Sequence, residues 1–146
     1  MDSRLREARA SDRKHVKQIA KSAFRFSRFH ADPKFGSALA SRIKAAWAAN
    51  YFLGQRGHRM LVAEEQGCLA GFILLMERPE VTAVDLIAVD PAFQGKGLGA
   101  ALLLAAETKG RRMTAGTQNT NLPSCRMYEK CGYTAGPREL VFHLHR

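Results

Sequence analysis

The chain has 146 residues, 46% of them apolar, and its 23 Lys and Arg against 13 Asp and Glu give a formal net charge of +10. This size and composition fit one compact domain over residues 1–146, with no low-complexity tract, signal peptide or apolar run long enough to cross a membrane. A cytoplasmic protein is therefore expected, and its basic charge favours anionic cofactors and substrates.

The distribution of residues disfavours two further classes of function. The basic residues are spread along the chain, without a long basic run or the aromatic-basic signature of RNA recognition, so no nucleic-acid partner is expected. The three cysteines, Cys68, Cys125 and Cys131, have the spacing of neither a metal site nor a disulfide framework. No metal is expected.

The N-terminal part of the chain is dominated by helical periodicity. The elements expected there are, in chain order, a strand over 5–8, a helix from about 11 to 24, a break at 29–33 and a second helix over about 37–50. Gly54 and Gly57 are expected to end the second helix. Its aromatic residues Trp47, Tyr51 and Phe52 are interpreted as core or as the wall of a pocket.

After these helices the period of the apolar residues changes. The remaining elements are predicted as strands over 60–63, 69–76 and 82–89, a helix over 98–109, a strand over 112–117, a helix over 122–131 and a strand over 139–145. Three strands joined by short turns, followed by alternating helices and strands, predict an α/β domain with a mixed sheet.

The segment Gln94-Gly95-Lys96-Gly97-Leu98-Gly99 lies between a predicted strand and a predicted helix. Its glycines let backbone N–H groups turn inward, and the helix N-terminus adds partial positive charge. The segment therefore predicts a phosphate-binding loop. Its spacing fits neither the dinucleotide fingerprint nor the loop that binds nucleoside triphosphates.

The pattern Gln-x-x-Gly-x-Gly after Val89-Asp90-Pro91 resembles the acetyl-CoA signature of the GNAT superfamily of N-acetyltransferases. A second segment, Asn121 followed by Tyr128-Glu129-Lys130-Cys131-Gly132-Tyr133, resembles the family's Asn…Tyr-Glu-Lys-x-Gly-Phe/Tyr ending. The order of elements is similar to the GNAT fold over nearly the whole chain. The resemblance implies a mostly antiparallel sheet with a splayed strand pair, and an acetyl-CoA-dependent N-acetyltransferase.

The resemblance also implies which residues serve the cosubstrate. Backbone amides of the glycine loop would hold the pyrophosphate of coenzyme A, and main-chain groups at the end of the preceding strand would pair with its pantetheine arm. The residues expected to bind it are Ile87, Ala88, Val89, Gln94, Gly95, Lys96, Gly97, Leu98, Gly99, Asn121, Ser124 and Tyr128. The Val89 N–H would lie near the thioester carbonyl as an oxyanion donor. Asn121 could equally be a helix cap.

Tyr128 is the expected general acid, because a phenol and a leaving thiol have similar basicity. An ordinary packing role is the alternative for this side chain. A competing covalent route would first acetylate Cys125 or Cys131.

The general base is harder to assign from sequence. Asp85 is the preferred candidate, because alternation would place it on the same strand face as Ile87 and Val89. Thr82 and His30 are the alternatives. His143 and His145 are interpreted as ordinary residues of the last strand.

A narrower resemblance suggests the acceptor amine. The segments 28–33, 47–57 and 116–121 look like the GNAT branch related to dTDP-fucosamine acetyltransferase, so an anionic nucleotide-linked amino sugar is the expected acceptor. The alternatives are acetylation of protein N-termini or lysines, as in ribosomal-protein acetyltransferases, and a non-catalytic acetyl-CoA sensor. The sequence leaves open the pathway and whether the chain is a monomer or a homodimer.

Overall fold

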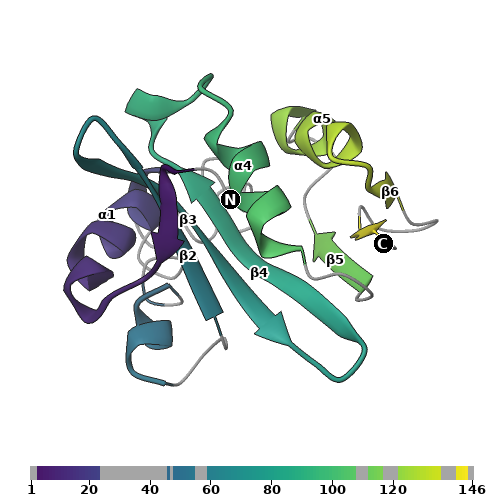
Figure 1. The fold of residues 1–146 in the computed structure, drawn as a ribbon, viewed down its shortest axis with the longest axis horizontal. Helices are drawn as coiled ribbons and strands as arrows, with labels where there is room; N and C mark the ends of the chain where they lie inside the picture. The colour runs from purple at the N-terminus through teal and green to yellow at the C-terminus, as the bar shows by residue number, and fades with distance from the viewer. Residues whose placement is uncertain are drawn as a thin grey trace, which may run out of the picture.

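The computed structural model describes residues 3–23, 46, 48–54, 59–107, 112–116, 122–135 and 141–144. Within these ranges the chain forms a seven-stranded sheet with the strand order β1-β2-β3-β4-β5-β7-β6 (Figure 1). The strands are β1 Leu5–Glu7, β2 Arg59–Glu65, β3 Cys68–Glu77, β4 Val81–Val89, β5 Arg112–Gly116, β6 Thr134–Ala135 and β7 Val141–Leu144. All neighbouring strands are antiparallel except β4 and β5, which are parallel, so the predicted mixed, mostly antiparallel sheet is confirmed.

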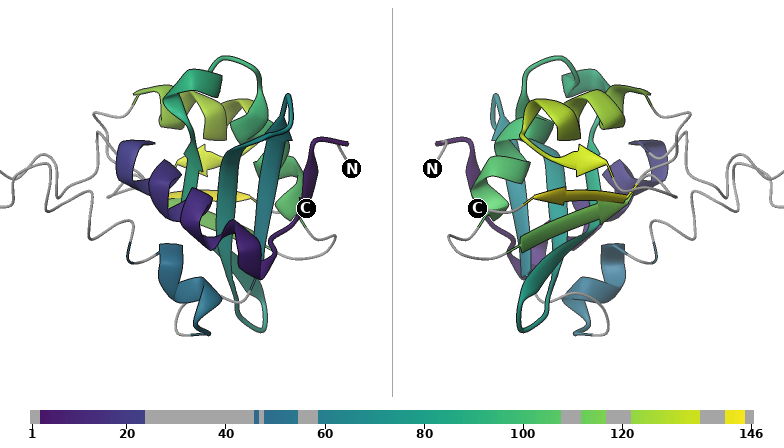
Figure 2. Two further views of the ribbon diagram at one scale, coloured as in Figure 1. Left: turned by 90° about the vertical axis from the view of Figure 1, so that its left-hand side faces the viewer. Right: turned by 90° about the vertical axis from the view of Figure 1, so that its right-hand side faces the viewer.

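Helices cover both faces of this sheet (Figure 2). Helix α1, Arg13–Ala23, follows a short 3-10 turn, Ala10–Asp12, and packs on one face, while α4, Leu98–Ala106, and α5, Leu122–Lys130, lie on the other. Alternation in β2 explains the two layers, because Met60 and Val62 join the α1 cluster whereas Leu61 and Ala63 join the α4 cluster.

Strand β4 is longer than its parallel partner. β5 pairs with the first half of β4, from Val81 opposite Arg112 to Val84 opposite Ala115, whereas β4 continues to Val89 along β3. Figure 1 shows β4 running on, past β5, toward the segment that precedes α4. The splayed strand pair expected from the family resemblance is therefore present in the described part of the sheet.

Most element boundaries agree with the sequence predictions, and the differences have local causes. α4 ends at Ala106 instead of 109, because Glu107 adopts an extended conformation. The two-residue strand β6 was not predicted, since it has no periodicity and exists only through its pairing with β7. Residues 48–52 are helical and Gly54, at φ 72°, follows the helix as expected, whereas Gly57 and Trp47 lie outside the described residues. No helix in the described ranges is long and apolar enough to cross a membrane.

Candidate active site

The glycine loop joins the end of β4 to the start of α4. Asp90 caps a short 3-10 turn, Pro91–Phe93, by accepting a hydrogen bond from the Ala92 N–H at 2.9 Å. Gly95 and Gly97 then take φ values of 83° and 75°, which lie in the left-handed region that favours glycine. Two of the three loop glycines are therefore required by backbone conformation.

Gly97 is the N-cap of α4, and the first helical hydrogen bond runs from the Ala101 N–H to the Gly97 carbonyl at 3.0 Å. The N–H groups of the first helical residues therefore have no acceptor inside the helix, and they point out of its N-terminus. A Cβ built on Gly95 or on Gly97 would meet no atom within 4 Å. The concentrated N–H groups and the open space match the geometry of an anion-binding loop.

The Gln94 side chain has a structural contact that the sequence did not indicate. Its Nε2 donates a hydrogen bond to the Val89 carbonyl at 3.2 Å, so the side chain ties the loop back to the end of β4. The backbone of Gln94 is extended, with φ −69° and ψ 155°. Gln94 therefore helps to set the path of the loop between strand and helix.

Two further glycines permit close approach around the same loop. A Cβ on Gly99 would lie 2.6 Å from the Met127 Sδ of α5 and 3.9 Å from a Val89 methyl group. A Cβ on Gly71 of β3 would lie 2.9 Å from the Ala88 carbonyl oxygen and 3.3 Å from the same Val89 side chain. β4, the start of α4 and α5 thus meet at Val89. Gly71 was missed by sequence analysis, because its reason is a tertiary contact.

Tyr128 lies in the last turn of α5 and is only 2% exposed. Its ring packs against Tyr133, with 5.4 Å between ring centroids, and belongs to the core cluster on the α4 side. Ile87 and Val89 are partly buried against that same cluster, so the fold brings Tyr128 and the end of β4 to one layer of the structure. The Tyr128 side chain is thus in a region of low dielectric, in the same layer of the structure as the end of β4.

Asp85 lies at a bulge in β4. Leu74 of β3 is opposite Leu86, but the next β3 residue, Leu75, is opposite Val84, so Asp85 is the extra residue. Strict alternation would place Val84 on the opposite face from Ile87 and Val89, yet all three pack against the same core cluster. The bulge therefore interrupts the alternation between Val84 and Ile87, and the face on which the Asp85 side chain lies stays a prediction.

The other candidate polar residues differ in how far the structure describes them. Thr82 is 2% exposed and lies in the half of β4 that pairs with β5, away from the glycine loop. Asn121, His30 and His145 lie outside the described residues, as do the side chains of Ser124, Cys125 and His143. Within the described residues, no group of three or more His, Cys, Asp or Glu could hold a metal ion.

An ion-pair network around Arg6 links β1 to β2 and to the turn before α1. Arg6 donates to both carboxylate oxygens of Asp12, at 2.8 and 3.0 Å, and its Nε donates to Glu64 at 2.7 Å. The Arg6 guanidinium lowers the pKa of the buried Asp12 carboxyl group, and the Arg9 N–H adds to the effect. The network joins β1, the start of α1 and β2, and its role is structural.

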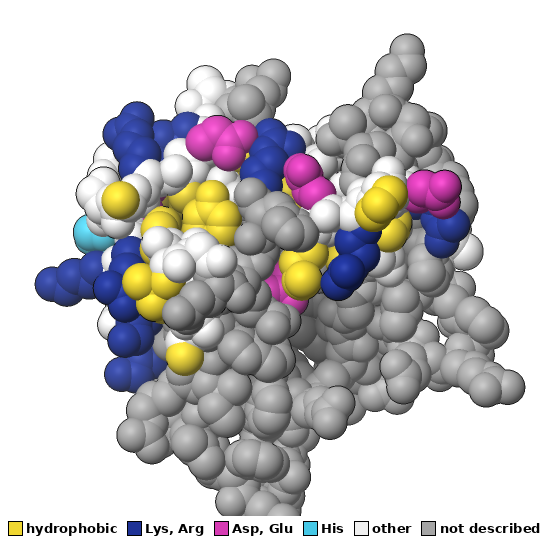
Figure 3. All heavy atoms as spheres, turned by 90° about the horizontal axis from the view of Figure 1, so that it is seen from below, with side chains coloured by type: hydrophobic (Ala, Val, Ile, Leu, Met, Phe, Trp, Pro, Cys, Tyr) yellow, Lys and Arg dark blue, Asp and Glu magenta, His cyan; other side chains and the backbone are white. Residues whose placement is uncertain are grey.

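Basic side chains gather on the outer face of α1 (Figure 3). Arg13, Lys14, Lys17 and Lys21 are all exposed, and no acidic residue occurs in this helix. Such a surface raises the local concentration of anionic ligands.

Comparison with known proteins identifies the family. The model of the acetyltransferase (GNAT) family matches residues 16–133, and the chain therefore belongs to this family. The chain is 33% identical over 138 residues to the spore coat polysaccharide biosynthesis protein SpsD of Bacillus subtilis (strain 168). This match covers 91% of this chain and 47% of that protein.

Two further similarities extend the comparison. The L-methionine sulfoximine/L-methionine sulfone acetyltransferase of Salmonella typhimurium (strain LT2) is 33% identical over 88 residues, which are 53% of this chain and 52% of that protein. The PaiA N-acetyltransferase of Thermoplasma acidophilum, solved in complex with coenzyme A, has the same fold, with a TM-score of 0.78 at 17% identity over 97% of this chain and 98% of that one. The chain thus spans about half the length of the curated relatives it matches.

Proposed function

We propose that this domain is an N-acetyltransferase that moves the acetyl group of acetyl-CoA directly to a primary amine. The observation that carries the proposal is the junction of β4 and α4. There, β4 continues beyond its pairing with β5 and leads into a loop with two left-handed glycines at the N-terminus of α4. Membership of the GNAT family supports the assignment, and the coenzyme A in the PaiA structure supports the choice of cosubstrate.

Acetyl-CoA supplies an activated acetyl group, and the residues of this chain would bind and orient it. The backbone amides from Gly95 to Gly99 would hold the pyrophosphate, and the main chain of Ile87, Ala88 and Val89 would pair with the pantetheine arm. A fixed Val89 N–H at the reacting carbonyl would stabilise the negative charge that develops there, a contribution of about 3 kcal/mol where such donors have been removed. Asn121 and Ser124, at the start of α5, complete the proposed binding set.

Tyr128 is proposed as the general acid that protonates the departing thiolate, and Asp85 as the base that takes a proton from the attacking amine. The burial of Tyr128 favours this role, because a neutral phenol in a water-excluded site keeps its proton until the thiolate forms. The Asp85 carboxylate is next to the splayed half of β4, where an acceptor would approach.

The proposed acceptor is a nucleotide-linked amino sugar or a similar anionic small molecule. The name of the relative SpsD places that protein in polysaccharide biosynthesis, and the second relative acts on derivatives of an amino acid. Both names favour a small-molecule amine over a protein chain. The net charge of +10 favours an acceptor that carries phosphate groups.

The test is a turnover assay with acetyl-CoA and matched amines, followed by release of the coenzyme A thiol. The panel contains nucleotide-linked amino sugars, the same amino sugars without the nucleotide, free amino acids, and peptides with free N-termini or lysines. We expect the nucleotide-linked sugars to have the highest kcat/KM, and this preference to weaken with salt, because the attraction is partly electrostatic. Acetylation of peptides alone would contradict the proposed acceptor and favour a protein acetyltransferase.

The alternative of a non-catalytic sensor makes a different prediction. A sensor would bind acetyl-CoA in calorimetry and release no thiol with any amine of the panel. Thiol release that depends on the acceptor would exclude it.

The role of Asp85 is tested by the pH dependence of kcat/KM. If Asp85 is the base, Asp85→Asn lowers turnover by about 10²- to 10⁴-fold and removes the acidic limb of the profile. Glu129→Gln, which neutralises an exposed carboxylate on α5, is the matched control and should leave the profile unchanged. An unaltered acidic limb in a folded Asp85→Asn protein would exclude Asp85 as the base.

A further inference from the structure

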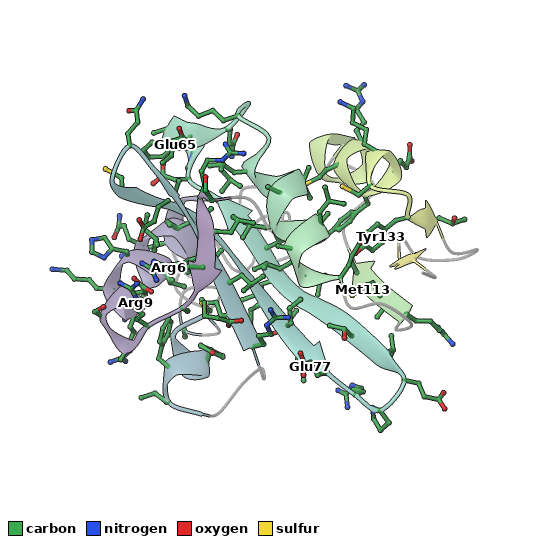
Figure 4. The ribbon with its side chains drawn as sticks, in the orientation of Figure 1. Arg6, Arg9, Glu65, Glu77, Met113 and Tyr133 are labelled. Carbon is green, nitrogen blue, oxygen red and sulfur yellow. The ribbon has the colours of Figure 1, made fainter. Side chains whose placement is uncertain are left out.

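Arg4 immediately precedes the first strand of the sheet and contacts Lys96 of the glycine loop, which is 92 positions away in sequence. Its Nη1 donates to the Lys96 carbonyl oxygen at 3.3 Å and forms an ion pair with Glu65 Oε2, also at 3.3 Å. The Arg4 backbone is itself fixed, because its carbonyl accepts a hydrogen bond from the Glu64 N–H at 2.8 Å. Figure 4 shows Glu65 at the end of β2, close to the segment that joins β4 to α4.

The contact with Lys96 determines the direction of an adjacent amide. The Lys96 carbonyl and the Gly97 N–H belong to one planar trans peptide, in which C=O and N–H point in opposite directions. A guanidinium that holds the carbonyl on the β1 side therefore turns the Gly97 N–H to the other side. The next carbonyl, that of Gly97, is fixed by the Ala101 N–H, so the conformation of Gly97 is held at both ends.

Such a restraint matters because the loop is intrinsically adaptable. Glycine populates left- and right-handed conformations about equally, so the φ values of Gly95 and Gly97 are not selected by the residues themselves. A loop that fluctuates must be ordered when an anion binds, and this ordering weakens binding. A contact that already selects the bound conformation removes that cost.

We propose that Arg4 is a positioning residue for the cosubstrate: by holding the Lys96 carbonyl, it orients the Gly97 N–H toward the pyrophosphate of acetyl-CoA. Glu65 keeps the Arg4 guanidinium in place. This inference rests on the proposed function of the glycine loop. The alternative is that Arg4 attracts the phosphates by its charge alone, and the two roles differ in their response to salt.

The chain offers a matched control for this test. Arg59 of β2 forms an ion pair with Glu7 of β1, with a distance of 3.0 Å between Arg59 Nε and Glu7 Oε1. Arg59 is the first residue of β2, so this pair lies at the opposite end of the strand from Glu65, the last residue of β2, which pairs with Arg4. Arg4→Met and Arg59→Met remove the same charge and side-chain donor, and both pairs are partly exposed, where ion pairs contribute little to stability.

The experiment measures the affinity for acetyl-CoA by calorimetry at about 0.05 M and about 0.5 M salt, in the wild type and both variants. We expect Arg4→Met to weaken binding about fivefold, a typical effect of one lost hydrogen bond, with the same ratio at both salt concentrations. Arg59→Met should bind like the wild type. At saturating acetyl-CoA, the kcat of Arg4→Met should equal that of the wild type.

Three results would overturn the inference: equal affinity of Arg4→Met and wild type, equal losses in both variants, or a loss that disappears at high salt and so reveals a charge effect. A wild-type protein that does not bind acetyl-CoA would instead contradict the proposed function. The amide signals of Gly95 and Gly97 in the free protein give an independent reading. We expect 15N relaxation to report increased motion of these two glycines in Arg4→Met and not in Arg59→Met.

Discussion

Replacement of Gly97 by alanine separates the backbone strain of the loop from its function. At φ 75° an alanine is in the left-handed region, which costs about 1–2 kcal/mol. No steric term adds to this cost, because a Cβ at Gly97 would meet no atom within 4 Å. The free energy of unfolding should therefore fall by about 1–2 kcal/mol, which corresponds to a decrease in Tm of about 2–8 °C for a domain near this size.

The same Cβ would occupy the open space above the loop amides, where the proposed pyrophosphate lies. Loss of one charge-assisted hydrogen bond of about 1.5–3 kcal/mol should weaken acetyl-CoA binding by about 10- to 100-fold. Gly54→Ala is the matched control, since Gly54 also has a left-handed φ, 72°, and open space around its Cβ, but follows the helical residues 48–52. It should lose similar stability and no affinity.

Chemical denaturation and calorimetry measure the two effects on the same samples. Gly97→Asn adds a third point, because asparagine tolerates the left-handed region and should retain stability while it still obstructs the loop. Normal acetyl-CoA affinity in folded Gly97→Ala and Gly97→Asn proteins would refute the assignment of the loop as the pyrophosphate site. Equal affinity losses in the Gly54 and Gly97 variants would attribute the effect to global stability.

Three further predictions concern packing, charge and chemistry. Gly99→Ala should lower the free energy of unfolding by about 1–3 kcal/mol, because its Cβ would approach Met127 Sδ to 2.6 Å. If this contact is the cause, the double variant Gly99→Ala, Met127→Ala should lose less stability in chemical denaturation than the sum of the two single variants. Arg6 lowers the pKa of Asp12 below the usual 3.8, so this pair stabilises the fold fully above that pH and less as the pH falls through the lowered pKa. Between pH 6 and pH 3 the free energy of unfolding should therefore decrease more in the wild type than in Asp12→Asn, as measured by chemical denaturation at each pH. Tyr128→Phe should reduce kcat by about 10²- to 10⁴-fold at unchanged acetyl-CoA affinity, and a near-normal kcat would exclude Tyr128 as the acid.

Cysteine variants distinguish direct acetyl transfer from a covalent route through an acetylated cysteine. Cys131 is buried and has a free thiol, and Cys68 is exposed with a free thiol. Direct transfer predicts that the double variant Cys125→Ala, Cys131→Ala keeps its turnover, which the same thiol-release assay measures. An isolable acetyl-enzyme in the wild type, lost in the double variant, would contradict direct transfer.

Local patterns were sufficient for the order of elements and for the position of the glycine loop. The short, continuous apolar runs of β2 and β3 and the glycine spacing after Val89 are patterns of neighbouring residues, so they can be read from the sequence. The bulge at Asp85 could not be read in this way. It depends on how β4 pairs with β3, and no single residue of β4 specifies the extra position.

The sequence by itself determined the family, the mixed sheet and the two glycines whose left-handed conformation forms the loop, because these depend on residue type and spacing along the chain. Only the tertiary structure decided that Gly71 and Gly99 are needed for close approach around Val89, and that Arg4 holds the Lys96 carbonyl. These contacts join residues that are distant in sequence. Their distances are set by the packing of helices on the sheet, so they cannot be predicted from the pattern of residues along the chain.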